Sequence, residues 1–288
     1  MTLKGPIVVG LSGGKDSFCL CLALRALGYD VRAAIVDLGY KRFQAHKVRD
    51  TAVALGISAD VLLPAEARTA NNPRLKRHLA VLQSSAQMPC GPCSSAKRIL
   101  LQQHVERMGG SYLALAHHRD DLIVTLLKDY FIADYYERFG AYDASDFFDY
   151  LQSATVDEEK LKQLIDTGSA STMGVTLPLD SCCTLVRPMA YIAEDEIRSF
   201  IASARVEIMG SGCSHDSLNS PTSVRTKREL VHDRWLSLLA HDPAKGDRLL
   251  QIALTSLDSS GRQKSNPRAA RRSRMPGFDD ETPCNSEQ

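Results

Sequence analysis

A short motif near the N-terminus has the side chains of a phosphate-binding loop. It consists of Ser12, Gly13, Gly14, Lys15, Asp16 and Ser17, between an apolar run at 7–11 and a segment with helical spacing. Glycines let the backbone turn sharply and come close to a ligand. Free N–H groups at the start of a helix, with the Lys15 ammonium and the serine hydroxyls, suit an anion. Asp16 fits beside a phosphate if Mg²⁺ lies between the two groups.

A cysteine pair is the second feature that could do chemistry. Cys90 and Cys93 form a C-x-x-C motif at the start of a predicted helix. Structural zinc usually takes four ligands, so this pair supplies half of such a site, and the sequence has no second C-x-x-C motif. The candidates for a further thiol ligand are Cys213 and the adjacent Cys182 and Cys183. The pair could also form a redox disulfide, or bind zinc with His215 and another ligand.

Three other cysteines are not expected to take part in chemistry. Cys19 and Cys21 lie inside the first predicted helix and are predicted core residues, while Cys284 lies in the tail. Buried cysteines behave as small apolar side chains, which is also the favoured interpretation of Cys182 and Cys183; a role in sulfur relay is the alternative.

A histidine and aspartate cluster follows the predicted strand at 112–116. It contains His117, His118, Arg119, Asp120 and Asp121. In a nucleotide-using enzyme, we expect such a cluster at the end of a strand to act at the site, although the histidines could also only support groups that do.

Strands and helices alternate along the chain. Apolar runs predict strands at 7–11, 31–38, 60–63, 112–116 and 184–188, and helical spacing predicts helices at 16–27, 44–55, 94–108, 119–132 and 194–204. The alternation predicts an α/β fold: a doubly wound parallel sheet of about five strands with helices on both faces. Right-handed crossovers place the loops after the strands at one edge, where ligands bind.

Two segments interrupt this pattern and define the predicted domains. Residues 129–183 contain eleven acidic residues against three basic ones, with many aromatics, and are predicted to form an acidic helical insertion. The ATP-binding core is then 1–128, and 184–257 completes it with C-terminal helices. Residues 258–288, rich in Ser, Arg, Pro and Asp, are predicted to be a disordered tail.

The motifs together resemble those of a known enzyme family. The SGGKDS loop lacks the Walker A spacing and resembles the loop of the PP-loop (N-type ATP pyrophosphatase) superfamily, whose fold is adenine nucleotide alpha hydrolase-like. With C-x-x-C after the third predicted strand and a single late cysteine, the chain looks like the TtcA/TtuA branch of tRNA 2-thiolation enzymes. Ala116 stands where the family has glycine, and Met209 to Gly212 stand where it often has another cysteine.

This resemblance implies cofactors and site residues. The cofactors are ATP, Mg²⁺ and a 4Fe–4S cluster, whose ligands would be Cys90, Cys93 and Cys213. The catalytic residues would be Lys15, Asp16, Lys97 and Asp120, with Asp16 and Asp120 holding Mg²⁺. We also expect Asp37, at the end of the second predicted strand, and His118 to contact the nucleotide.

The resemblance implies an ATP-dependent sulfurtransferase that adenylates a nucleobase carbonyl oxygen and replaces that oxygen with sulfur. The favoured substrate is tRNA, with 2-thiocytidine or 2-thiouridine as the product. Alternatives are the same thiolation, or its reverse, on a free nucleobase-like small molecule, and an amidating ligase without sulfur chemistry. A sulfur donor such as a cysteine desulfurase or sulfide is implied as a partner, and a homodimer is conceivable.

Charge and hydropathy give few further limits. The formal net charge is +1, but basic residues cluster at 68–107, at 225–234 and in the tail, where RNA could bind, whereas the acidic insertion would repel RNA. No apolar run approaches the roughly 18 residues of a membrane span, so no membrane partner is expected. The eight cysteines then indicate metal or redox chemistry in a chain predicted to be cytoplasmic.

Overall fold

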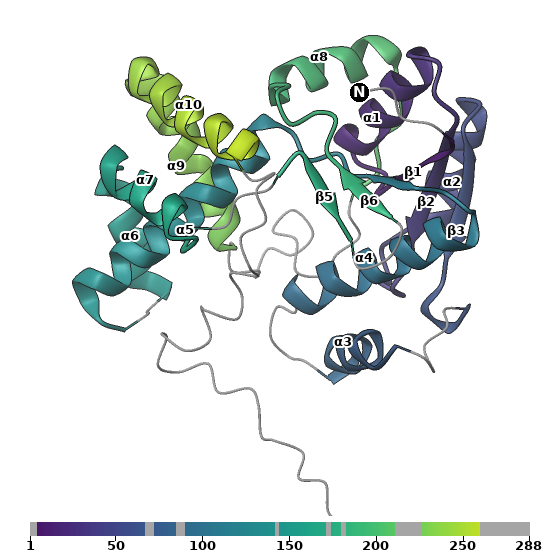
Figure 1. Ribbon diagram of the computed structural model, residues 1–288, viewed down its shortest axis with the longest axis horizontal. Helices are drawn as coiled ribbons and strands as arrows, with labels where there is room; N and C mark the ends of the chain where they lie inside the picture. The colour runs from purple at the N-terminus through teal and green to yellow at the C-terminus, as the bar shows by residue number, and fades with distance from the viewer. Residues whose placement is uncertain are drawn as a thin grey trace, which may run out of the picture.

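A six-stranded sheet organises the protein. The computed structural model describes residues 5–66, 72–84, 90–141, 144–170, 174–179, 183–210 and 226–259. The strands are β1 (Ile7–Gly10), β2 (Val31–Val36), β3 (Ser58–Leu62), β4 (Tyr112–Ala114), β5 (Thr176–Pro178) and β6 (Thr184–Val186), in the order β3-β2-β1-β4-β6-β5. All neighbouring pairs are parallel except β5 and β6. Figure 1 shows this sheet in one half of the molecule, which we call the sheet lobe.

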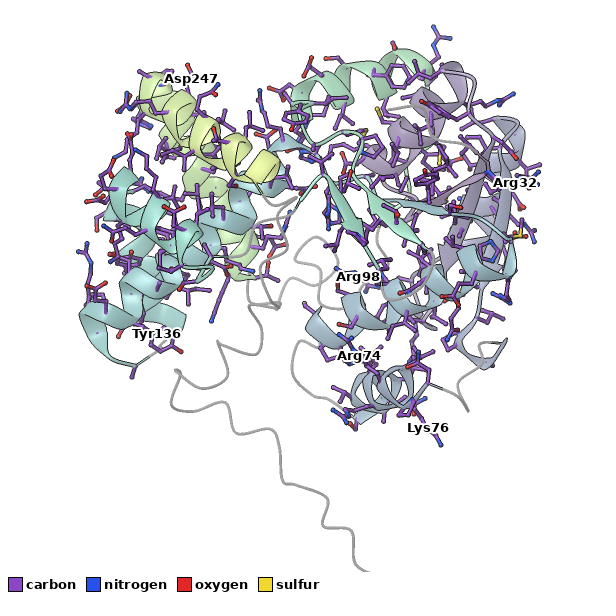
Figure 2. The ribbon with its side chains drawn as sticks, viewed as in Figure 1. Arg32, Arg74, Lys76, Arg98, Tyr136 and Asp247 are labelled. Atoms are coloured by element: carbon purple, nitrogen blue, oxygen red, sulfur yellow. The ribbon has the colours of Figure 1, made fainter. Side chains whose placement is uncertain are left out.

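The other half is helical and has its own core. We call it the helical lobe; it contains most of α5 (Arg119–Phe139), with α6 (Ala144–Ser153), α7 (Glu158–Asp166), α9 (Lys227–His241) and α10 (Pro243–Ser259). Its core includes Trp235, Tyr130 and Phe147, all almost completely buried. In Figure 2, Tyr136 and Asp247 lie on this lobe, whereas Arg32 and Arg74 lie on the sheet lobe. Helix α5 starts at the sheet and crosses into the helical lobe, so it joins the two.

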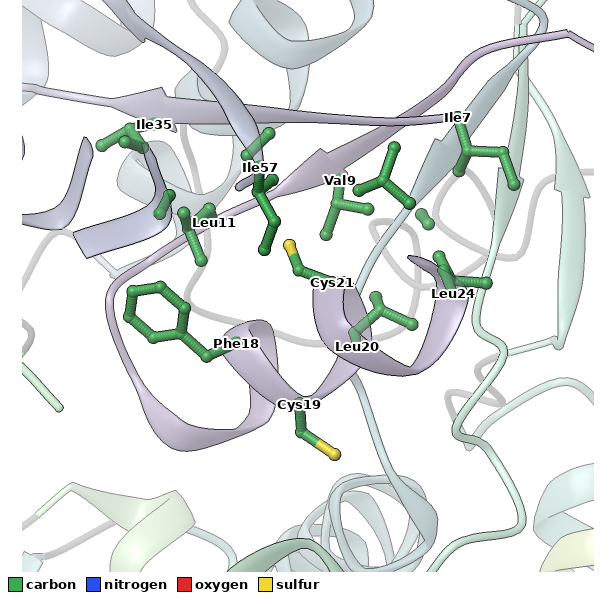
Figure 3. Close-up of a cluster of buried hydrophobic side chains, with 14 of the residues drawn as sticks. Ile7, Val9, Leu11, Phe18, Cys19, Leu20, Cys21, Leu24, Ile35 and Ile57 are labelled. Carbon is green, nitrogen blue, oxygen red and sulfur yellow. The ribbon is translucent and has the colours of Figure 1, made fainter. Parts of the chain in front are cut away.

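Helices cover both faces of the sheet, which is why the central strands β1, β2 and β4 are mostly apolar and buried. On one face, α1 (Lys15–Ala26), α2 (Ala45–Ala54) and α8 (Glu194–Ala204) pack on the strands. Figure 3 shows part of this core, with Phe18, Leu20 and Cys21 of α1 against Val9 of β1. On the other face, α3 (Pro73–Ser84) and α4 (Cys90–Arg107) cover Val8 and Leu113.

The α/β prediction is confirmed, with three differences in detail. Strand β5 lies inside the range predicted as a helical insertion; it is a three-residue edge strand whose residues are all exposed, so it leaves no apolar run to detect. Helix α5 continues past 132 to Phe139 and ends where Gly140 has a φ of 74°. Helices α9 and α10, assigned to the end of the core, pack in the helical lobe.

The predicted tail begins near the end of α10, and residues 260–288 lie outside the described residues. Among the helices of the described ranges, none has both the length and the apolar character that a bilayer span requires.

Candidate active site

A cavity of about 510 Å³ lies at the carboxyl ends of β1, β2 and β4. The lining side chains that carry chemistry are Ser12, Asp16, Ser17, Cys90, Cys93, Lys97, His117, Asp121 and Arg228. The phosphate motif and the cysteine pair, 73 or more residues apart in the sequence, therefore share one cavity. This is the edge at which ligands bind in sheets of this kind.

The phosphate loop is held in shape by its own residues. Gly13 has a φ of 89°, and a Cβ there would lie 2.8 Å from Val48 Cγ2, so both the conformation and the close approach require glycine. Ser17 Oγ donates to the Gly14 carbonyl at 2.9 Å and accepts from the Ser12 N–H at 3.2 Å. Gly14, the N-cap of α1, makes no side-chain cap, so the first N–H groups of this helix suit a phosphate.

Lys15 is anchored to a neighbouring helix. Its Nζ lies 2.9 Å from Asp16 Oδ1 and 2.9 Å from Glu194 Oε1, in the first turn of α8. Burial alone would lower the pKa of Lys15, but the two carboxylates outweigh burial and raise it. Burial alone would raise the pKa of Glu194, but the charges of Lys15 and Arg198 outweigh burial and lower this pKa to about 2. Lys15 is not among the residues that line the cavity; Asp16 is.

The two neighbouring aspartates at the start of α5 have different partners. Asp120 is 6% exposed; its Oδ1 accepts from Trp235 Nε1 at 3.2 Å, and its Oδ2 accepts from the Glu194 N–H at 2.9 Å. Asp121 lines the cavity instead and pairs with Arg228 of α9. The carboxylate that follows β4 and faces the cavity is therefore Asp121, and Asp120 ties α5 to α8 and α9.

Both histidines after β4 are enclosed. His118 is 4% exposed, and its Nε2 lies 3.5 Å from Asp121 and 3.8 Å from Asp16, so it stands behind the two carboxylates of the cavity. Burial, followed by the charge of Arg187, lowers the pKa of His117 to about 4, which leaves a neutral imidazole at neutral pH. Its Nδ1 has no hydrogen-bond partner, a state that a bound ligand would relieve.

The cysteine pair lies in the first turn of α4. Cys90 is exposed and Cys93 is half-buried, and residues three apart lie on one face of a helix. The Tyr40 hydroxyl donates to Cys93 Sγ at 3.1 Å. Lys97, one turn further along, lines the same cavity. Two thiols beside an anion-binding loop suit an iron–sulfur cluster, which thiolates hold.

The predicted third ligand, Cys213, lies outside the described residues, as do Cys182 and Cys284. The described chain before it ends at the phosphate loop, where the Met209 N–H donates to the Gly13 carbonyl at 3.0 Å. After the gap, α9 brings Arg228 to the cavity. Within the described ranges, no three His, Cys, Asp or Glu side chains form a metal-binding group.

The remaining cysteines follow the sequence expectation. Cys19, Cys21 and Cys183 are buried among apolar side chains, and burial raises the pKa of the Cys21 thiol to about 12. They are therefore unreactive core residues.

Asp37 shapes a turn beside the cavity and is not among the lining residues. Its Oδ1 accepts from the Gly39 N–H at 2.8 Å, and Gly39 has a φ of 81°. This turn places Tyr40 in the cavity wall. The sequence did not indicate Tyr40 or Arg228 as site residues, although Arg228 lies in a predicted basic stretch. Asp121 was predicted as part of the cluster after β4, but the role beside Mg²⁺ was given to Asp120.

Comparison with known proteins gives consistent relatives, although no protein-family model matches the chain. The chain is 27% identical over 214 residues to the tRNA-cytidine(32) 2-sulfurtransferase of Pelobacter propionicus, covering 72% of this chain and 64% of that protein. It is 27% identical over 251 residues to the protein of the same name from Anaeromyxobacter dehalogenans, covering 85% and 70%. The chain thus spans just under two thirds of the first relative's length.

A solved structure shares the fold. The U34-tRNA thiolase NcsA from Methanococcus maripaludis, determined with its [4Fe-4S] cluster, superposes with a TM-score of 0.59 at 17% identity. The superposition covers 91% of this chain and 74% of that one.

Proposed function

We propose that this chain thiolates tRNA, because it is similar in sequence to tRNA-cytidine(32) 2-sulfurtransferases and shares its fold with a U34-tRNA thiolase. The reaction uses ATP to adenylate a nucleobase carbonyl oxygen and then replaces that oxygen with sulfur, with 2-thiocytidine as the favoured product. The observation that carries the proposal is the single cavity lined by both the phosphate loop and the cysteine pair.

In the first step, the loop residues Ser12 to Ser17 would bind the phosphates of ATP. The substrate oxygen attacks the α-phosphate, a carbon–oxygen–phosphorus link forms, and pyrophosphate leaves. The N–H groups at the start of α1 would stabilise the charge that develops on the leaving group. Asp16 and Asp121 face the cavity and are the carboxylates we assign to Mg²⁺, while Asp120 holds α8 and thereby the Glu194–Lys15 pair.

In the second step, a carbon–sulfur bond forms and the carbon–oxygen bond to AMP breaks, so that AMP leaves with the original oxygen. Cys90 and Cys93, with Cys213 as the third ligand, would hold the 4Fe–4S cluster. The cluster, when bound, would supply the sulfur atom, which a desulfurase or sulfide must replenish. Lys97, whose side chain lines the cavity near the cysteines, would balance the charge of the adenylate phosphate.

Anaerobic purification tests the cofactor and the third ligand together. We expect about four irons per chain. Cys213→Ala should lose the iron, and Cys284→Ala is the matched control that should keep it. A colourless protein that contains zinc in place of iron would refute the thiolation chemistry.

Incubation of the iron-loaded protein with ATP, sulfide and unmodified tRNA tests the substrate. Mass spectrometry of the digested tRNA should reveal a 2-thiolated pyrimidine that is absent without ATP. Thiolation of a free base with no change in tRNA would replace tRNA by the small-molecule alternative. Pyrophosphate release without any sulfur incorporation would favour an amidating ligase.

A further inference from the structure

Helix α3 carries a concentrated positive charge. Its twelve residues include Arg74, Lys76 and Arg77 and contain no aspartate or glutamate. All three cations are exposed. Because α3 contains no carboxylate, its cations form no ion pairs within the helix. Their charge is therefore available to an anionic partner.

The apolar side of α3 fixes its orientation. Leu75 is completely buried, and Leu79 and Leu82 pack against the same core cluster. Leu100 and Leu101 of α4 belong to that cluster, so α3 lies on α4. Figure 1 shows the two helices next to each other on one face of the sheet. The cations of α3 are therefore held on the outer side of a packed helix pair.

The positive charge continues toward the cavity. Helix α4 begins with the cysteine pair, and Lys97 and Arg98 line the cavity one to two turns later. Figure 2 shows Arg98 on α4 and Arg74 and Lys76 on α3, all on the sheet lobe. Basic side chains therefore lie on both helices of this packed pair, and those of α4 line the cavity.

The opposite lobe has the opposite charge. Residues 144–170 contain six acidic residues against two lysines. Both lysines are already paired, Lys160 with Asp134 and Lys162 with Glu159. A phosphate backbone that approaches the cavity would be repelled on that side and attracted by α3 and α4.

We propose that Arg74, Lys76 and Arg77 bind the phosphodiester backbone of the RNA substrate beside the cavity. This proposal rests on the proposed function. A base that is modified in a cavity must leave its stack, so the flanking backbone lies on the protein surface around the cavity. Contacts to phosphates position the nucleic acid without reading its sequence.

Binding of bulk tRNA to the full chain at several salt concentrations tests the proposal. The triple variant Arg74→Gln, Lys76→Gln, Arg77→Gln should bind tRNA roughly tenfold or more weakly near 0.1 M salt. Each phosphate contact contributes about 0.7–0.9 to the slope of log affinity against log salt, so the slope should fall by about 2–3. ATP binding and thermal stability should stay unchanged, because the three side chains are exposed.

A matched variant removes three cations from the helical lobe: Lys162→Gln, Lys245→Gln, Arg248→Gln. It should bind tRNA as the wild type does. Equal weakening by both triple variants would overturn the proposal, since net charge alone would explain it. An α3 variant with wild-type affinity and slope would overturn it too and leave the proposed function intact. A wild-type chain that binds no tRNA would refute tRNA as the substrate, and the α3 surface with it.

Discussion

The helical lobe and the cavity of the sheet lobe differ in whether their buried polar side chains have hydrogen-bond partners. In the helical lobe, Asp134 is 3% exposed and is fully engaged: Tyr150 donates to Oδ2 at 2.6 Å, Lys160 to Oδ1 at 2.6 Å, and Arg138 lies 2.8 Å away. Among the described residues of α6, α7, α9, α10 and of α5 from Asp120 onward, no buried polar side-chain atom lacks a hydrogen-bond partner. At the cavity of the sheet lobe, His117 Nδ1 and His118 Nδ1 both lack one.

This difference separates structural from functional polarity. A buried group without a partner costs on the order of 1–3 kcal/mol, so it persists where a ligand completes it or where reactivity requires it. A satisfied network such as that of Asp134 adds rigidity and has no capacity left for a ligand. We therefore expect substitutions at the cavity to reduce activity with little effect on stability, and substitutions in the helical network to do the reverse.

The largest expected effect is that of Asp16→Asn at the cavity. Loss of the carboxylate that we assign to Mg²⁺ should reduce ATP-dependent thiolation by about 10²–10³-fold, as for other removed groups that stabilise developing charge. The melting temperature should change by less than about 2 °C, because Asp16 is not a core residue. Thiolation assays and thermal unfolding of the same preparation measure both. A large loss of stability with normal activity would contradict the assignment.

The reverse outcome is expected for Asp134→Ala. It leaves the buried Tyr150 hydroxyl without its acceptor, while the partly exposed Lys160 ammonium keeps Glu137 as a partner, so the loss should be about 1–3 kcal/mol. For a chain of this size, the melting temperature should fall by roughly 2–12 °C. Iron content and ATP binding of the folded protein should stay normal. Lys162→Ala, which removes an exposed ion pair on α7, is the control and should cost less than about 1 kcal/mol.

Glu194 contacts both lobes. The pH dependence of its contribution to stability tests whether the contacts between the lobes are ionic. Its Oε1 contacts Lys15 of the phosphate loop, and its Oε2 lies 3.4 Å from His232 of α9. Because the folded-state pKa of about 2 lies below the ordinary 4.5, the carboxylate stabilises the fold above about pH 4.5. This contribution disappears as the pH falls toward 2.

Glu194→Gln should therefore lose about 1–2 kcal/mol at pH 7, a value discounted for partial exposure, and roughly 0.4–0.8 kcal/mol at pH 3, where the folded-state carboxylate is still mostly ionised. Urea unfolding of both proteins at the two pH values measures the difference. Glu196→Gln is the matched control in the same turn, since its carboxylate only caps the Ala193 N–H. An equal loss at both pH values would contradict an ionic role for Glu194.

The sequence predicts the parts of this site that depend on local structure. The phosphate loop and the start of α4 are local: glycines after a buried strand, and cysteines three residues apart. Which of two adjacent aspartates faces the cavity is not local, because neighbours on a helix point about 100° apart and packing sets the rotation. Here Trp235 and the start of α8 donate hydrogen bonds to Asp120, and Asp121 faces the cavity.

Residues that reach the cavity from distant elements cannot be predicted from the sequence, because packing also decides their positions. Arg228 reaches the cavity only because α9 packs beside α5 in the helical lobe, and no spacing within 225–234 indicates that contact. Helix α3 escaped prediction, although its alternation of leucines and cations is amphipathic. The insertion was predicted as a helical unit from its composition, but its partners in the core, α9 and α10, follow from the fold alone.

The smallest expected effect concerns the hydrogen bond from Tyr40 to Cys93, the polar contact by which the turn after β2 reaches the cysteine pair. A net hydrogen bond is worth about 1 kcal/mol, so Tyr40→Phe should bind the same amount of iron but release it to a chelator about fivefold faster under anaerobic conditions. Hydrogen bonds to sulfur tune such centres, so the reduction potential should also move to more negative values. Tyr112→Phe, which removes a hydroxyl at the far end of β4, is the control and should change neither quantity. Wild-type iron release and potential in Tyr40→Phe would mean that the cavity groups of the sheet lobe act on the iron through charge alone.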